Sequence, residues 1–154
     1  MISENSKYNF KRLAGIISEG LTLVPDPSGR SDKGTLSYYV EEYMLNITSV
    51  IISQLDQNLT SEGYKVAISQ GNTKMQENVL ATKLIISSNG RASNSKEYVL
   101  TTLVNFEQGG NTAVSVSHNS LTEQFNLNSK HTWSDVQLFV KEIITHISNS
   151  LKVN

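Results

Sequence analysis

The stretch "KEYVLTTLVNFEQGGNTAVSVSHN", residues 96–119, decides the fold. Along residues 96–107, alternate side chains share one face: Tyr98, Leu100, Thr102, Val104 and Phe106. Residues 111–119 continue the same two-residue period, with Val114, Val116 and His118 on one face. A period of two is typical of β-strands. The stretch therefore predicts two strands with Gly109-Gly110 between them.

The glycine pair Gly109-Gly110 allows two interpretations, a phosphate-binding loop or the bend of a hairpin. A phosphate loop needs a strand, then glycines, then a helix whose N-terminal amides point at the anion. Here a strand follows the glycines, and the Lys-Ser/Thr pair of a nucleotide loop is missing. A hairpin turn that needs positive φ explains the pair, so we favour the hairpin.

Two other segments carry the period of an α-helix. In residues 35–60 the apolar side chains recur every three or four positions: Val40, Met44, Ile47, Ile51 and Leu55. Residues 132–152 show the same spacing in Trp133, Val136, Val140, Ile143, Ile147 and Leu151. Such a stripe is typical of an amphipathic helix that covers a core. Thr132 and Asp135 resemble a capping box at the start of the second helix.

The length of 154 residues fits a single domain over 1–154. We expect 1–34 to hold one or two N-terminal strands and a loop, 35–60 a helix, 63–119 strands and 132–152 a helix. This order, β-α-β-β-β-β-α, predicts an α+β two-layer sandwich: an antiparallel sheet of about four to five strands with two long helices on one face. We expect the opposite face to carry Val99, Thr101 and Leu103 or their alternates, and the N-terminal segment or a partner to cover part of it.

Composition and charge exclude several function classes. The chain has no cysteine, which removes disulfides and thiolate metal sites. The net charge of −1 lacks the basic surplus of a nucleic-acid binder. The start "MISENSKYNF" has no apolar core of a signal peptide. We therefore expect either a cytosolic protein or one whose signal was trimmed before Met1.

Residues that often carry catalysis are present, but not in catalytic patterns. His118, His131 and His146 fall on different segments and lack the spacing of metal ligands. Glu41 and Glu42 are helix neighbours whose side chains diverge by about 100°. No G-x-S-x-G elbow surrounds any serine. The sequence therefore predicts no catalytic residue, no metal site and no cofactor.

The best candidate for binding is the segment "PDPSGRSDKG", residues 25–34, with the start of the helix that follows it. It carries two cations, Arg30 and Lys33, and Tyr38 and Tyr39 come next. Both tyrosines cannot point at the sheet, so at least one should lie near the surface, where tyrosine suits an interface. The loop is either a plain crossover or a protein-binding surface. An open edge of the sheet, where a partner adds a strand, is the second candidate.

The segments "LDQNLTSEGYKVAI" (55–68) and "VLTTLVNFEQGGNTAVSV" (99–116), together with the helix from Trp133, resemble small bacterial envelope lipoproteins of the YajG and LptE types. This resemblance implies a non-enzymatic accessory domain that binds another protein at the periplasmic or outer-membrane face. The lipid-bearing cysteine of such proteins is absent, so membrane attachment would require an N-terminal anchor lost with a trimmed signal. The alternative is a cytosolic binding protein, such as an immunity protein or a secretion chaperone.

Overall fold

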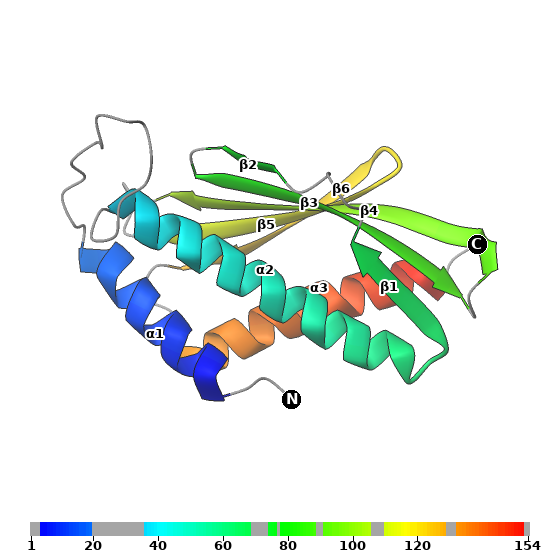
Figure 1. Ribbon diagram of the computed structural model, residues 1–154, viewed down its shortest axis with the longest axis horizontal. Coiled ribbons are helices and arrows are strands. Elements are labelled where there is room, and N and C mark those ends of the chain that lie inside the picture. Colours follow the sequence, from blue (N-terminus) through cyan, green and yellow to red (C-terminus); the bar gives the residue numbers. More distant parts are fainter. Residues whose placement is uncertain are drawn as a thin grey trace.

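The computed structural model describes residues 4–19, 36–68, 74–76, 78–88, 91–105, 110–128 and 132–152. They form an α+β fold with a layer of helices on one side of an antiparallel sheet (Figure 1). The elements in chain order are α1 (Glu4–Glu19), α2 (Leu36–Thr60), β1 (Tyr64–Ile68), β2 (Lys74–Gln76), β3 (Val79–Ser88), β4 (Arg91–Asn105), β5 (Asn111–His118), β6 (Leu121–Leu127) and α3 (Trp133–Lys152). The predicted fold class is therefore confirmed.

The sheet is built from successive antiparallel neighbours. Its strand order is β1-β3-β4-β5-β6, and the short β2 pairs with β3 beside β1. Across β3, β4 and β5, buried side chains lie opposite one another: Thr82 lies opposite Leu100, and Leu100 lies opposite Val116. Along β3 and β5 every second residue is buried. One set of side chains therefore points at the helices, and the other set points away from them.

The two helices expected from their apolar stripes lie across one face of the sheet (Figure 1). On α2 the whole stripe is buried: Val40, Met44, Ile47, Ile51 and Leu55. On α3 the buried residues are Val136, Phe139, Val140, Ile143, Ile144, Ile147 and Leu151. None of the described helices is both long and apolar enough to cross a membrane.

The prediction of one or two N-terminal strands is wrong, because residues 4–19 form the helix α1. Its buried residues Phe10, Leu13 and Ile17 follow the helical period. The Phe10 ring packs edge-on against Tyr43 of α2, with ring centroids 5.8 Å apart, and lies 5.6 Å from the Trp133 ring of α3. The helix α1 therefore belongs to the helix layer and does not cover the opposite face. Residues 20–34 of the N-terminal segment lie outside the described residues, and cover by a partner stays a prediction.

The hairpin interpretation of the glycine pair is confirmed at Gly110. Strands β4 and β5 pair from Val99 opposite Ser117 to Asn105 opposite Asn111. The Gly110 amide donates to the Asn105 carbonyl oxygen over 3.0 Å, and Gly110 has a φ of 87°. No L-residue adopts that φ easily, so the turn needs glycine here. Gly109 lies outside the described residues.

The predicted capping box of the last helix is confirmed. The Asp135 amide donates to the Thr132 hydroxyl over 3.2 Å, and the Thr132 amide donates to the Asp135 carboxylate over 2.8 Å. These two bonds satisfy amides that the first turn of a helix leaves without partners. They therefore fix the residue at which α3 begins and hence its position beside β6.

Candidate functional site

The face of the sheet that points away from the helices has no cover among the described residues. Cross-strand neighbours from β3, β4 and β5 lie in three rows on it: Val79, Leu103 and Ala113; Ala81, Thr101 and Ser115; Lys83, Val99 and Ser117. All are half-buried except Leu103, which is 40% exposed. We call these nine residues the uncovered face.

Eight of the nine residues of the uncovered face are uncharged, and most of its side chains are short. Its one charged residue, Lys83, is paired with Glu97 of the next strand, with 3.3 Å between the ammonium nitrogen and the carboxylate oxygen. The solvent side of an antiparallel sheet normally alternates to polar residues. Here Val79, Val99 and Leu103 interrupt that pattern. Of these three residues Leu103 is exposed and the two valines are half-buried. Apolar residues on the solvent side of a sheet are candidates for an interaction surface.

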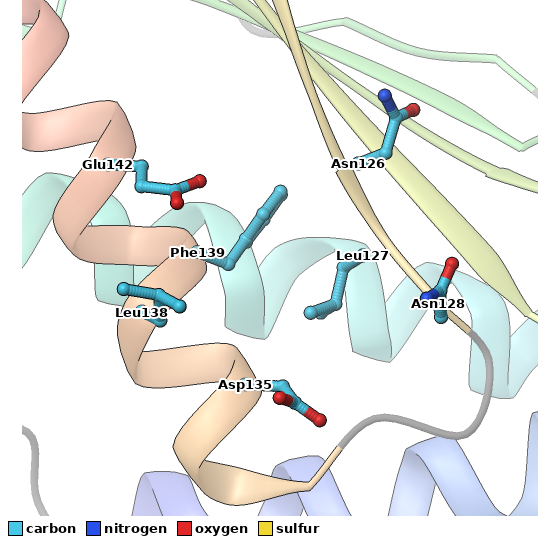
Figure 2. A pocket seen from close by; sticks show the side chains of 7 residues that line it. All are labelled: Asn126, Leu127, Asn128, Asp135, Leu138, Phe139 and Glu142. Carbon is cyan, nitrogen blue, oxygen red and sulfur yellow. The ribbon is translucent and has the colours of Figure 1, made fainter.

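A second feature is a hollow of about 330 Å³ between α3 and the end of β6 (Figure 2). Its lining residues are Asn126, Leu127, Asn128, Asp135, Leu138, Phe139 and Glu142. The side chains of Leu127 and Phe139 are buried, so they form an apolar floor. Figure 2 shows the Glu142 carboxylate directed toward the space between helix and strand, and the Asp135 carboxylate at the start of α3, where it accepts from the Thr132 amide. The hollow is therefore apolar at its base and acidic at its rim.

A neighbouring hollow of about 340 Å³ continues along the outer side of α3. It shares Leu138 and Glu142 with the first hollow and adds Lys141, Thr145, His146 and Asn149. Leu138 is 57% exposed, which is unusual for a large apolar side chain on an amphipathic helix. His146 packs edge-on against Phe125 of β6, with ring centroids 5.6 Å apart. Because the two hollows share Leu138 and Glu142 of α3, we call them together the β6–α3 groove.

A third hollow, of about 590 Å³, lies where β4 extends past the end of β5. Its polar groups are engaged with the protein itself. The His118 ring stacks on the Tyr98 ring with centroids 4.6 Å apart, and its Nδ1 lies 2.9 Å from the Glu97 carbonyl oxygen. Tyr98 and Ser150 share a hydrogen bond of 2.9 Å between their hydroxyl groups. These contacts tie the end of α3 to β4, which is a structural role.

Two phenols have pKa values raised by desolvation. Burial raises the pKa of Tyr98, and its hydrogen bond to Ser150 opposes the shift. Burial raises the pKa of Tyr43 further, against a lowering by Thr112, whose hydroxyl lies 3.2 Å from the Tyr43 oxygen. Both phenols therefore stay protonated at neutral pH. Neither is poised as a general base, which would need a pKa near the working pH.

The residues predicted for protein binding are only partly described. Arg30 and Lys33, with the whole segment 25–34, lie outside the described residues. Tyr38 and Tyr39 are both half-buried on α2, and their rings meet edge to face with centroids 5.4 Å apart. Tyr39 also packs against the core. Their role in binding stays a prediction.

The described titratable groups do not converge. No three His, Cys, Asp or Glu side chains of the described residues lie close enough together to hold a metal ion. His118 is on β5 and His146 on α3, and His131 lies outside the described residues. Glu41 and Glu42 are adjacent half-buried residues of α2.

The β6–α3 groove was missed by sequence reasoning because the predicted strands ended at residue 119. The signal was present in "LTEQFNL", residues 121–127, where Leu121, Glu123, Phe125 and Leu127 alternate with polar residues. A two-residue turn, Asn119-Ser120, joins His118 to its partner Leu121, and Asn119 has a φ of 57°. Asparagine at positive φ is a known hairpin signal.

Comparisons with protein-family models, with curated proteins and with solved structures each found no match for this chain. A functional argument therefore starts from the surfaces described above.

Proposed function

We propose that this chain is a non-enzymatic, protein-binding accessory domain, and that the uncovered face is its main binding surface. The observation that carries the proposal is the exposure of Leu103, at 40%, on the central strand of a face whose residues are uncharged apart from Lys83. Short side chains let a second surface approach a sheet closely, and the valines with Leu103 supply apolar area that gains by leaving water.

The partner that suits this face is a protein with a flat and uncharged surface. Burying an unpaired charge against such a face would be costly. Lys83 and Glu97, which neutralise each other, suit the rim of such an interface better than its centre. A sheet or a helix packed over Leu103 and Val99 would complete a second apolar layer on the sheet.

The location of this activity follows from the resemblance to envelope lipoproteins of the YajG and LptE types. In that version of the proposal, the domain assists a partner at the periplasmic or outer-membrane face of a bacterium. The alternative version is a cytosolic binding protein such as an immunity protein or a secretion chaperone. Both versions use the same face, and they differ in the compartment where the partner is found.

The test places a photo-crosslinking amino acid at position 103 in cells of the source organism. A matched protein carries it at Asp56, an exposed position of α2 in the helix layer. We expect one main adduct from position 103 that is absent from position 56. Leu103→Asp should then weaken retention of that partner by at least about tenfold, equivalent to about 1.4 kcal/mol, while the melting temperature stays close to that of the parent.

Three outcomes would count against the proposal. Identical adducts from positions 103 and 56 would show that the crosslinks are unspecific. Unchanged retention of the partner by the Leu103→Asp variant would show that the uncovered face is not the binding surface. Loss of the partner only in a variant with Tyr38→Ala, Tyr39→Ala and a shortened 25–34 segment would move the binding surface to the start of α2. A partner that is a second copy of this chain would keep the face but redefine the function as self-association.

A further inference from the structure

The strand β6 is the last strand of the sheet. Within the described residues it pairs with β5 on one side and has no strand on the other. The outward amides and carbonyl groups of such an edge are available to another chain. Most side chains of β6 are exposed, and only Leu127 at its end is buried. The 7 residues of β6 therefore form a free and accessible template.

The side chains around this edge are acidic. Glu123 is exposed and lies opposite Val116, whose side chain faces the helices, so Glu123 is on the same side of β6 as α3. Glu142 directs its carboxylate into the space between α3 and β6, and Asp135 lines the first hollow at the start of α3 (Figure 2). Among the described residues, the lining of the first hollow includes no Lys or Arg, and Lys141 lies farther along the groove. The edge therefore favours a cationic partner.

The groove also provides an apolar contact. Leu127 and Phe139 form its floor, and Leu138 stands at its rim, 57% exposed. Side chains on one face of an extended peptide repeat about every 7 Å. A peptide that places one apolar side chain on this floor would thus have side chains two positions before and two positions after it on the same face. Those two side chains would lie near the acidic residues of the groove.

We propose that the β6–α3 groove binds an extended peptide with basic residues, which adds as a strand to the free edge of β6. Main-chain hydrogen bonds supply the affinity, as in other cases of strand addition, and alternate side chains supply the specificity. On the side facing α3, the pattern is basic, apolar, basic at every second position. The proposal does not rest on the uncovered face, which is a different surface of the sheet.

The probe is the capped peptide Thr-Arg-Thr-Leu-Thr-Lys-Thr, which has the length of β6 and carries the proposed pattern on one side. It is titrated into the isotopically labelled protein at low ionic strength, and amide shifts are followed by NMR. We expect saturable shifts confined to β6 and the outer side of α3. A control peptide with Glu in place of Arg and Lys should produce no saturable shift.

Two matched variants test the acidic rim. Glu142→Gln keeps the shape of the side chain and removes its charge, so it should raise the Kd of the probe about two- to fivefold, as for an exposed ion pair. Asp56→Asn makes the equivalent change on α2, near β1 at the opposite edge of the sheet, and should leave the Kd unchanged. Equal effects of the two variants would overturn the proposed site.

Two N-methylated probes test strand addition itself. One carries methyl groups on the amides of the first, third and fifth residues, and the other on those of the second, fourth and sixth. Because a strand uses the amides of only one edge to pair with a neighbour, one probe should lose at least about tenfold in affinity and the other should keep it. If both probes bind like the parent, or the shifts fall outside β6 and α3, the proposal is wrong.

Discussion

The two faces of the sheet come from the same strands but differ in how far their side chains are buried. In β4, Leu100 points at the helices and is 1% exposed, whereas Leu103 points away and is 40% exposed. The covered face is completed by three helices, and the uncovered face has no cover among the described residues. The same residue type therefore contributes to stability on one face and is available for binding on the other.

The helix-covered face also contains hydroxyl groups, and most of its buried threonines form hydrogen bonds. Thr48 of α2 lies 3.2 Å from Thr102 of β4, oxygen to oxygen. The Thr112 hydroxyl lies 3.2 Å from both the Tyr43 oxygen and the Gly110 carbonyl oxygen. Buried polar groups cost free energy unless they find such partners. Polar side chains therefore occur on both faces of the sheet. The uncovered face differs in having no covering layer among the described residues.

The largest expected effect comes from one substitution made on each face of β4. Leu100→Asp would bury an unpaired carboxylate, which should lower the free energy of unfolding by about 4 kcal/mol or more. Leu103→Asp puts the carboxylate in water, so it should cost at most about 1 kcal/mol. Urea unfolding of both variants measures the difference. Similar midpoints for the two would show that the faces are assigned wrongly.

The next effect concerns the hairpin that ends this pair of strands. Gly110 has a φ of 87°, and a Cβ added there would meet the side chain of Ile17 of α1. Gly110→Ala should therefore lower the free energy of unfolding by about 2 kcal/mol or more, from the left-handed backbone together with the displaced isoleucine.

A double-mutant cycle separates the two causes of that loss. In an Ile17→Ala background the steric conflict is relieved, so Gly110→Ala should cost only the backbone part, about 1 kcal/mol. Thermal unfolding of the four proteins gives the coupling energy. An equal cost in both backgrounds would mean that Ile17 of α1 does not contact the hairpin at Gly110.

How much of this fold follows from the sequence depends on the strength of each local pattern. The stripes of α2 and α3 and the turn at Gly110 were predicted, because spacing and glycine act locally. Helix α1 was missed although Phe10, Leu13 and Ile17 carry its period, because Gly15 interrupts the apolar residues of this segment. Gly15 is exposed in α1, and a Cβ there meets nothing within 4 Å. Gly15 therefore lowers the stability of α1 without ending the helix.

The candidate surfaces were harder to predict than the elements. The face opposite the helices was expected to carry Val99, Thr101 and Leu103 or their alternates, because alternation along a strand does not say which set faces the core. The chain could also have placed its N-terminal segment on either layer. The β6–α3 groove lies between β6 and α3. The strand β6 was not predicted, because most residues of its sequence are polar. A groove of this kind depends on packing between elements, which no local pattern reports.

The smallest effect compares two threonines, one on each face. Thr82 is 2% exposed on the covered face, and its hydroxyl finds no hydrogen-bond partner among the described residues. Thr82→Val keeps the shape and removes the unsatisfied group, so it should raise the free energy of unfolding by about 1 kcal/mol. Thr101→Val makes the same change on the uncovered face, where water can satisfy the hydroxyl, and should change it by less than about 0.5 kcal/mol. Chemical unfolding of the two variants measures both values. A loss of stability in Thr82→Val would mean that this hydroxyl has a partner, and the covered face would then satisfy all of its buried threonines.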